Sequence, residues 1–244
     1  MRALVKFLLS AMGINLGGLR IKYKSKDETF LEKDLVSKEP FGQFDAWFKE
    51  AVSKKEILEP NVMCLATATR NGCPSARYML CKEYGKEGFK FFTNYGSSKA
   101  QDMEENPYVA ATFYWVVLNR SVRIEGYVEK LSEEESTKYF QERPIPNQIS
   151  AASSCQSTPI ESRDVLRERE SILEKEYLVP GKKVPKPYFW GGYIIRPTSV
   201  EFWQGQTNRL HDRIRFRRLH EGEVADGKLL HQGEDGWVYE RLSP

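Results

Sequence analysis

Residues 201–217 have the sequence EFWQGQTNRLHDRIRFR, the most informative stretch in this chain of 244 residues. If it forms an extended strand, alternate side chains share one face of a sheet. That face would carry a row of cationic or titratable side chains: Arg209, His211, Arg213, Arg215 and Arg217. The opposite face would direct Leu210, Ile214 and Phe216 toward a core. Neighbouring cations repel, so a folded protein keeps such a row only beside anions or in open water.

The residues just before the row suit a planar, phosphorylated ligand. Trp203 offers a flat aromatic surface, and Gly205 lets backbone approach a ligand closely. Amide donors and acceptors come from Gln204, Gln206 and Asn208. The alternative is a solvated basic edge strand, which would prevent aggregation between sheets. The charge pattern alone leaves both interpretations open.

The composition is that of an ordinary globular protein able to bury a core, with 40% hydrophobic and 29% charged residues. The net charge of +3 is too mild to indicate nucleic-acid binding, and its local concentration favours small anionic ligands. The four cysteines include no C-x-x-C pair and there are only three histidines, so we expect no metal site. Reduced thiols in an intracellular protein are the expectation.

The amino-terminal segment is basic, with no acidic residue before Asp27. Its apolar part is interrupted by Lys6 and Asn15, so it cannot span a bilayer. Such a start is typical of a mitochondrial presequence, of a secretory cleavage site, or of a leader on a cytosolic enzyme. We favour a cytoplasmic protein, with mitochondrial targeting as the alternative. We expect residues 1–18 to be a disordered or targeting leader and residues 19–244 to be one domain.

The order of the expected strands favours an antiparallel barrel. Five strands within about seventy residues, each close to the next, predict a meander or barrel rather than a βαβ fold. They are expected at 61–69, 75–83, 89–93, 108–117 and 121–131, with later strands at 190–195, 200–203, 209–217 and 237–242. Asn71-Gly72 is a strong hairpin signal between the first two. The fold class is therefore mainly β with helices, an α+β arrangement.

Four helices are expected around the barrel. Apolar residues at helical spacing in 40–52 predict a core-facing helix that begins at Pro40 and includes Val52. Ser97 or Ser98 caps a short helix, a capping box at 132–135 begins a helix through Glu142, and Ser162 caps a surface helix over 163–177. Pro144 and Pro146 are expected to end the third helix. Neither a G-x-G-x-x-G motif nor a P-loop is present, so a nucleotide must be held in another way.

Four separated segments combine cations, hydroxyls or amides with strand ends, where side chains can converge. They are 77–82, 93–99, 156–157 and 203–213. A phosphate dianion removed from bulk water requires several charge-assisted donors of this kind. Each segment alone is a weak indication, since a single pair of cations on a strand usually lies on the surface.

The order of these segments resembles the FMN-dependent pyridoxine/pyridoxamine 5′-phosphate oxidase family. The motif W-Q-G-Q-T-N-R-L-H-D-R is similar to the family's carboxy-terminal signature. Similar motifs are Ser75-Ala76-Arg77, Phe91-Phe92-Thr93-Asn94, Phe113-Tyr114-Trp115, Arg143-Pro144, Gln156-Ser157, Trp190-Gly191-Gly192-Tyr193 and Tyr239-Glu240-Arg241-Leu242-Ser243-Pro244. The resemblance runs from about residue 19 to the end and implies an antiparallel FMN-binding split β-barrel, homodimeric with FMN at the subunit interface.

The resemblance also implies roles for individual residues. Those expected to bind FMN are Arg77, Tyr78, Met79, Leu80, Phe92, Thr93, Ser98, Lys99, Ser121, Gln156, Ser157, Trp203 and Arg213. Those expected to bind the substrate are Lys82, Tyr139, Arg143, Asn147, Arg209, Leu210 and His211, with Arg209 and His211 catalytic at the substrate ring. Tyr139 and Arg143 are four residues apart on the capped helix, hence neighbours on one face.

Three positions depart from the family pattern: Ser98, Ser121 and Asn147 stand where an arginine, a glutamine and a serine are usual. Ser98 removes a full charge from the expected flavin-phosphate site. Losing one charge-assisted contact costs about 1.5–3 kcal/mol, so we expect weaker FMN binding. Asn147 can still donate a hydrogen bond.

The resemblance implies oxidation of pyridoxamine and pyridoxine 5′-phosphate to pyridoxal 5′-phosphate, with FMN as hydride acceptor and O2 as reoxidant giving H2O2. Arg209 is better suited to an electrostatic clamp than to a base, whereas His211 could exchange a proton near neutral pH. An alternative is a non-catalytic flavin or pyridoxal-phosphate carrier on the same barrel. A nucleic-acid-binding barrel using the arginine row is disfavoured by the mild net charge, and no membrane partner is expected.

Overall fold

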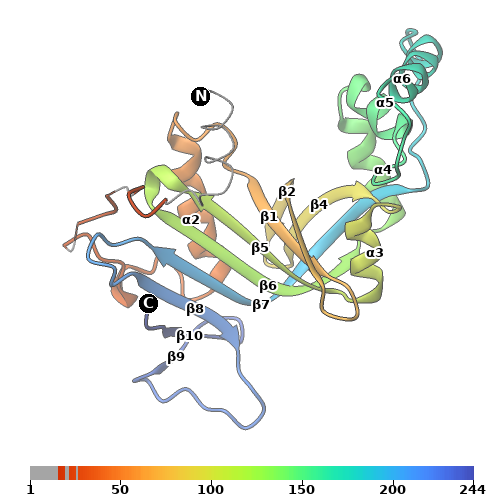
Figure 1. Cartoon of the computed structure of the whole chain (residues 1–244). Coiled ribbons are helices and arrows are strands. Elements are labelled where there is room, and N and C mark those ends of the chain that lie inside the picture. Colours follow the sequence, from red (N-terminus) through yellow and green to blue (C-terminus); the bar gives the residue numbers. More distant parts are fainter. Residues whose placement is uncertain (1–15, 20–21, 26) are drawn as a thin grey trace, which may run out of the picture.

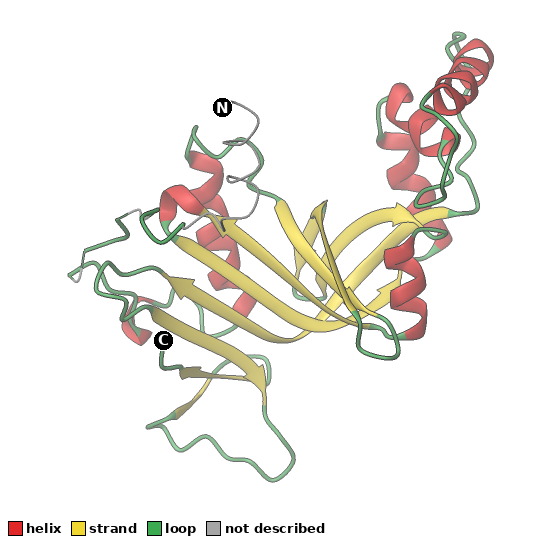
Figure 2. Cartoon of the chain, viewed as in Figure 1, coloured by secondary structure: helices red, strands yellow, loops and turns green. Residues whose placement is uncertain are grey.

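The computed structural model describes residues 16–19, 22–25 and 27–244. Within them, ten strands form one antiparallel sheet accompanied by five α-helices (Figures 1 and 2). No helix in these ranges is long and apolar enough to cross a membrane. The expected leader, residues 1–18, lies almost wholly outside the described residues. The prediction of a mainly β, antiparallel fold with helices is confirmed.

The sheet runs in the order β2-β1-β5-β6-β7-β8-β10-β9, with β4 pairing with both β3 and β7. The strands are β1 (Val62–Ala68), β2 (Pro74–Leu80), β3 (Glu83–Gly85), β4 (Gly88–Asn94), β5 (Tyr108–Trp115), β6 (Arg120–Lys130), β7 (Trp190–Gln204), β8 (Asp212–Arg218), β9 (Leu230–Gln232) and β10 (Trp237–Arg241). The predicted hairpin at Asn71-Gly72 joins β1 to β2, and Gly72 has a φ of 80°. The short strands β3 and β9 were not predicted.

Strand β7 connects the two halves of the sheet. Two strands were predicted here, but residues 190–204 form one. Its first part pairs with β4 and its last part with β8, while β6 follows it along the other edge. The β6–β7 register shifts between Glu125 and Gly126, where a Cβ on Gly126 would overlap the Arg196 carbonyl oxygen. The bulge lets a single long strand bend, so it needs no break.

Helix α2 (Pro40–Ser53) covers the inner face of the sheet. The Glu39 side chain caps it by accepting hydrogen bonds from the first backbone N–H groups. The rings of Phe44 and Phe113 lie 5.1 Å apart, and those of Trp47 and Phe202 lie 5.2 Å apart. This confirms the core-facing helix. Val52 was expected in the core and is 57% exposed, because it lies at the edge of the buried stripe.

The remaining helices are α3 (Ser98–Glu105), α4 (Glu133–Glu142), α5 (Ile145–Ser153) and α6 (Asp164–Tyr177). The Ser132 hydroxyl accepts the Glu135 N–H at 3.1 Å, which confirms that cap. Helix α5 was not predicted, because prolines that end one helix also suit the first turn of the next. Helices α4–α6 form an arm that projects from the sheet (Figure 1), and α6 has no buried residue, as expected of a surface helix.

The basic strand predicted over residues 209–217 begins later in the structure than expected. Strand β8 begins only at Asp212, and Arg209 lies in the preceding turn with a φ of 70°. Arg209 and His211 therefore do not share a strand face with the later arginines. Leu210, expected to point toward a core, is 67% exposed, because this turn leaves the sheet.

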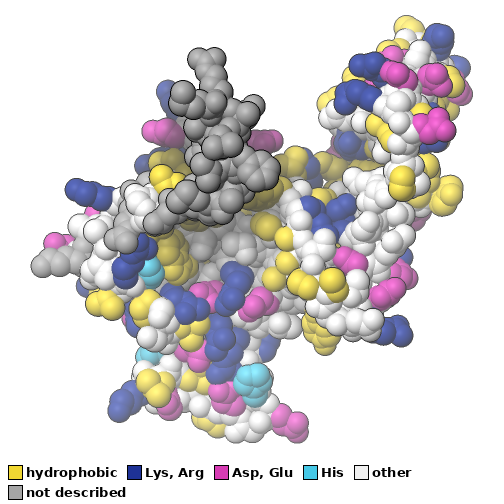
Figure 3. Space-filling view, in the orientation of Figure 1, with side chains coloured by type: hydrophobic (Ala, Val, Ile, Leu, Met, Phe, Trp, Pro, Cys, Tyr) yellow, Lys and Arg dark blue, Asp and Glu magenta, His cyan; other side chains and the backbone are white. Residues whose placement is uncertain are grey.

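The later arginines do share a face, and each lies beside an acid. Arg213 Nε is 2.7 Å from Glu201, Arg215 Nε is 2.8 Å from Glu240, and Arg217 Nη1 is 2.6 Å from Glu223. Figure 3 shows basic and acidic side chains interspersed over this part of the molecule. The anions expected beside such a row are present. This pairing leaves little free positive charge for a nucleic-acid backbone.

Candidate ligand-binding site

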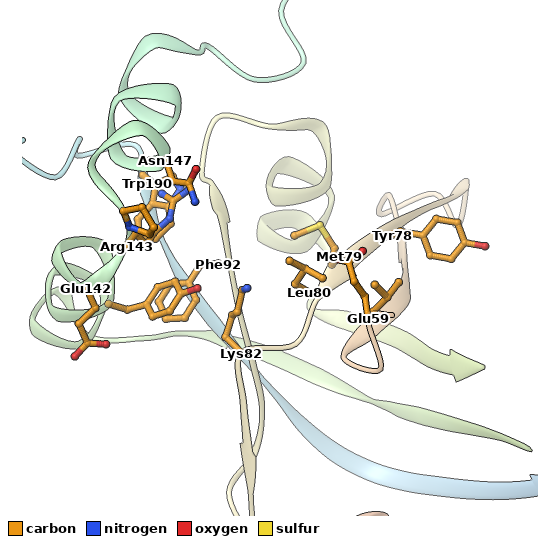
Figure 4. Close-up of a pocket in the computed structure, with 13 residues that line it drawn as sticks. Glu59, Tyr78, Met79, Leu80, Lys82, Phe92, Glu142, Arg143, Asn147 and Trp190 are labelled. Atoms are coloured by element: carbon orange, nitrogen blue, oxygen red, sulfur yellow. The ribbon is translucent and has the colours of Figure 1, made fainter. Parts of the chain in front are cut away.

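A cavity of about 640 Å³ lies between β2 and helices α4 and α5, and we call it the Arg143 cavity (Figure 4). Eight predicted site residues line it: Tyr78, Met79, Leu80, Lys82, Phe92, Tyr139, Arg143 and Asn147. In Figure 4 the Lys82 amine extends into the space between the Arg143–Trp190 wall and Met79 with Leu80. The four residues predicted to hold a substrate phosphate are therefore brought together.

Arg143 is the clearest sign of an anionic ligand in this cavity. Its Nη1 atom is buried and has no hydrogen-bond partner. The guanidinium carbon lies 4.9 Å from the centre of the Trp190 ring, which holds the group in place. Burial lowers the pKa of Arg143, and the opposing effect of Tyr139 is smaller. A buried charged donor without a partner is costly, so this position favours a bound anion.

An aromatic wall supports Arg143. The Phe92 ring stacks on Tyr139 with centroids 3.9 Å apart and on Trp190 with centroids 5.5 Å apart. Sequence reasoning gave no role in this cavity to Glu59, Glu142 and Trp190, which also line it. Trp190 belongs to a motif quoted for the family resemblance, but Glu59 has no local signal, because it precedes β1 and reaches the cavity only through the fold.

A second cavity, of about 350 Å³, adjoins the first and is called the Lys99 cavity. It is lined by Arg77, Tyr78, Met79, Ser98, Lys99, Gln156 and Ser157. Tyr78 and Met79 line both cavities. A smaller cavity of about 270 Å³ contains Thr93 and shares Phe92 and Arg143 with the first and Gln156 with the second. These predicted cofactor residues therefore lie in one continuous region.

Lys99 is a buried cation whose hydrogen-bond partners are all neutral. Its Nζ lies 3.2 Å from Thr93 Oγ1, 3.2 Å from Ser97 Oγ and 3.0 Å from Gln156 Oε1. Burial, and then the nearby charge of Arg77, lowers the pKa of Lys99 to about 8. The site lies at the amino terminus of α3, where backbone N–H groups favour anions. Two cations, hydroxyls and a helix terminus are a donor set that fits a phosphate.

A further cavity, of about 490 Å³, lies over β5–β8 and is called the His211 cavity. Four predicted residues line it: Ser121, Trp203, His211 and Arg213. It shares no lining residue with the Arg143 and Lys99 cavities. Arg209 and Leu210 are exposed beside it, and the Arg209 guanidinium lies 5.9 Å from the ring of Tyr23. Within one chain, the predicted site residues thus divide into two groups.

Charge in the His211 cavity is balanced by a buried carboxylate. Burial raises the pKa of Glu201, but hydrogen bonds and charges from Arg213 and Arg123 outweigh it, so the pKa lies below its usual value. Burial, followed by the charge of Arg209, lowers the pKa of His211 despite the opposite effect of Asp212. The lowered pKa favours the neutral form of the His211 imidazole. Its ring lies 4.9 Å from that of Trp203.

The strand register places Tyr78 of the first group on the same face of the sheet as Glu201 of the His211 cavity. Tyr78 pairs with Cys64, Cys64 with Thr112, Thr112 with Arg123, and Arg123 with Glu201. Directly paired residues in an antiparallel sheet point to the same side. Exposed aromatic side chains on the strands of this region are Tyr78, Tyr108, Tyr114 and Tyr127. A face with such exposed rings suits contact with another protein surface.

An antiparallel sheet with adjoining cavities lined by cations and hydroxyls has donor groups that suit phosphorylated ligands, although the chain has no P-loop. In the described ranges, no group of three His, Cys, Asp or Glu could hold a metal ion. Residues 49–169 match the family profile described as pyridoxamine 5′-phosphate oxidase, and residues 190–244 match that of the pyridoxine 5′-phosphate oxidase C-terminal dimerisation region. The chain belongs to the pyridoxamine 5′-phosphate oxidase family.

Individual relatives of this chain carry names from the same family. A Bombyx mori protein named pyridoxine/pyridoxamine 5′-phosphate oxidase is 72% identical over 96% of this chain and 91% of its own. A Bos taurus protein named pyridoxine-5′-phosphate oxidase is 51% identical over 95% of this chain and 88% of its own. The crystal structure of PhzG from Burkholderia lata, in complex with tetrahydrophenazine-1-carboxylic acid, superposes with a TM-score of 0.77 at 27% identity, covering 91% of this chain and 100% of that one.

Proposed function

We propose that this protein oxidises pyridoxamine 5′-phosphate and pyridoxine 5′-phosphate to pyridoxal 5′-phosphate, with FMN as hydride acceptor and O2 as the final oxidant, giving H2O2. The observation that carries this proposal is the unpaired, buried Nη1 of Arg143, in a cavity that adjoins the one around Lys99. Two anion sites side by side suit two phosphorylated ligands whose rings must meet. The family membership and the 72% identical relative support the same reaction.

The residues of this chain would divide the binding between them. Arg77, Lys99 and Ser157 would hold the FMN phosphate, and Lys82, Tyr139, Arg143 and Asn147 the substrate phosphate. FMN, when bound, supplies the capacity to accept a hydride. The protein contributes alignment: with both phosphates anchored, the donor carbon and the cofactor ring are held at reacting distance, which removes much of the entropic barrier.

The complete site requires two chains in this proposal. The His211 cavity and the Arg143 cavity share no lining residue within one chain. Residues 190–244, which carry His211, match a dimerisation region. A homodimer with FMN at the interface would bring His211 of the partner subunit, with its neighbours at 209–210, to the substrate ring held by Arg143. Ser121, Trp203 and Arg213 would then complete the flavin site from the partner's side.

Mixed dimers test this arrangement. Chains with Arg143→Leu are refolded together with chains carrying His211→Ala, each pure variant being poorly active. If sites form across the interface, one site of each mixed dimer has neither substitution, and peroxide production from pyridoxamine 5′-phosphate reappears. If both residues belong to one chain's site, every site remains damaged and no activity returns, which would contradict the shared site.

A second candidate function rests on Ser98. The Lys99 cavity has a serine hydroxyl at this position, where the family pattern has the positive charge of an arginine. A weaker flavin site could serve a carrier of flavin or pyridoxal phosphate. The wild-type protein under air distinguishes the two functions. Sustained H2O2 release with pyridoxamine 5′-phosphate supports the oxidase, whereas bound ligand without turnover supports the carrier.

A further inference from the structure

The backbone of Gln206 forms two hydrogen bonds within the turn that carries Arg209 and His211. Its backbone N–H donates to His211 Nδ1 at 2.9 Å, and its carbonyl oxygen accepts the Arg209 N–H at 3.1 Å. Arg209 adopts a left-handed φ of 70°, which costs energy in a residue other than glycine. A strained turn persists only where surrounding contacts determine it. The backbone of Gln206 supplies two of those contacts.

The Gln206 side chain is itself anchored. It is 2% exposed, and its Nε2 donates to Asp212 Oδ2 and to the Glu28 carbonyl oxygen, both at 2.9 Å. Asp212, 6% exposed, also accepts the Phe30 N–H at 2.9 Å through Oδ2 and Arg241 Nη1 at 3.0 Å through Oδ1. One buried carboxylate therefore ties the turn to the amino-terminal segment and to the last strand.

We propose that Gln206 and Asp212 are positioning residues that hold His211 as the neutral Nε2–H tautomer and present it as a hydrogen-bond donor to the substrate. A backbone N–H can only donate, so the Nδ1 atom facing it must carry a lone pair. In a neutral imidazole the proton then resides on Nε2. The proposal rests on the proposed function only in taking the ligand of His211 to be the substrate.

The same contact opposes protonation of His211, because an imidazolium would direct Nδ1–H against the Gln206 N–H. The charged or titratable groups around the ring are Arg209 and Asp212 on its own segment, Tyr23 from the amino-terminal segment, and Tyr114, Arg123, Glu201 and Arg213 from the sheet. Asp212 is the nearest carboxylate in sequence, but both of its oxygens are committed to Phe30, Gln206 and Arg241. His211 thus acts as a fixed donor and not as a base.

The tautomer can be measured directly, because the chain contains only three histidines. Holoprotein made with ¹⁵N-histidine is recorded at neutral pH without substrate, and His211→Gln identifies the His211 signals by their loss. We expect a pyridine-type Nδ1 shift and a pyrrole-type Nε2 shift. A pyrrole-type Nδ1, alone or together with a pyrrole-type Nε2, would overturn the proposal. This measurement does not depend on turnover, so a protein without oxidase activity would refute the proposed function and leave the tautomer result intact.

Two variants test the positioning role. Gln206→Leu removes the side-chain hydrogen bonds to Asp212 and Glu28. Asp212→Asn removes the negative charge that accepts hydrogen bonds from Gln206, Phe30 and Arg241. In either variant the two His211 ¹⁵N shifts should move toward each other as the second tautomer becomes populated. We expect kcat to fall about 10- to 100-fold with a smaller change in KM, as for a misplaced catalytic group.

Gln204→Leu is the matched control. Gln204 is 3% exposed and its Nε2 also donates to the Glu28 carbonyl oxygen at 2.9 Å, but its Oε1 accepts from Arg120, so its side-chain hydrogen bonds lead away from the turn. It should cost stability while leaving the His211 shifts unchanged. Wild-type shifts and wild-type kcat in both test variants would refute the positioning role. If one variant fails to fold, the other and the wild-type tautomer still decide the question.

Discussion

Lys99 Nζ lies 3.0 Å from the side-chain oxygen of Gln156, although the two residues are 57 positions apart in the chain. The ammonium comes from the first turn of α3 and the amide from the loop after α5. Their contact closes the wall of a cavity that also receives Arg77 from β2. A cation that is buried against neutral partners favours a bound anion, and this makes the Lys99 cavity testable through ligand affinity.

The first prediction concerns the pH dependence of FMN binding. The pKa of Lys99 is lowered to about 8, and a bound phosphate favours its charged form. Affinity should therefore be highest below this pKa and fall as pH rises through it, while the phosphate stays a dianion. Fluorescence titration of apoprotein with FMN on both sides of pH 8 measures the change. Lys99→Arg keeps its charge and should flatten the profile, and a flat wild-type profile would contradict the assignment.

The second prediction concerns Ser98, which lines the same cavity and whose N–H donates to Ser157 Oγ at 3.2 Å. Ser98→Arg should tighten FMN binding about 10- to 100-fold, because one charge-assisted contact contributes about 1.5–3 kcal/mol. Equilibrium flavin titration measures it. Gln101→Arg adds the same charge one turn along α3 at an exposed position and should have little effect. Equal gains in both variants would indicate general electrostatics in place of a specific contact.

The third prediction separates the two anion sites. Arg143→Leu should raise KM for pyridoxamine 5′-phosphate about 10- to 100-fold by removing a charge-assisted contact, with FMN affinity unchanged. Unphosphorylated pyridoxamine, which lacks the group that Arg143 would bind, should be affected far less. Arg167→Leu, an exposed arginine on α6 paired with Asp164, is the matched control and should leave both constants unchanged. Loss of flavin from Arg143→Leu would show that Arg143 binds the FMN phosphate and not the substrate phosphate.

The fourth prediction concerns stability. Glu201→Gln leaves Arg213 and Arg123 without their shared carboxylate. The arginines are partly exposed, so solvent limits the cost to about 1–2 kcal/mol. The pKa of Glu201 is lower in the folded protein than the usual 4.5, so its stabilisation is present above that value and is lost as pH falls through the folded pKa. Urea denaturation should show a difference between wild type and variant that shrinks on acidification.

The control for this measurement is Glu125→Gln, since Glu125 forms a more exposed pair with Arg123 at 3.6 Å. It should change the free energy of unfolding by less than the Glu201 substitution at neutral pH. A difference between wild type and Glu201→Gln that grows on acidification would contradict a lowered pKa of Glu201 in the folded protein.

Much of the architecture could be predicted from local patterns. Helix α2 and strands β1, β5 and β6 fall within a few residues of their expected bounds, because hydrophobic spacing and the turn residues act over short distances. The capping serine at 132 acted as expected for the same reason. Helix α5 was missed because Pro144 and Pro146 end one helix and begin another, and local rules do not distinguish these roles.

The candidate site was predictable in its residue types and less so in its arrangement. The resemblance placed Arg77, Lys99 and Arg143 among the binding residues, and the fold brings them into adjoining cavities. Glu59 and Trp190 had no such role assigned, because their approach to the Arg143 cavity depends on elements far apart in the chain.

By itself the sequence determined that the chain forms antiparallel strands, and which cations, hydroxyls and aromatic rings are available for phosphorylated ligands. Alternation and turn chemistry act between near neighbours, so they can be read without a fold. Only the tertiary structure decided that Arg209 and His211 leave the strand in a turn. Asp212, which accepts a hydrogen bond from Gln206 in that turn, also accepts the N–H of Phe30, 182 residues away, and contacts over such separations have no local pattern in the sequence.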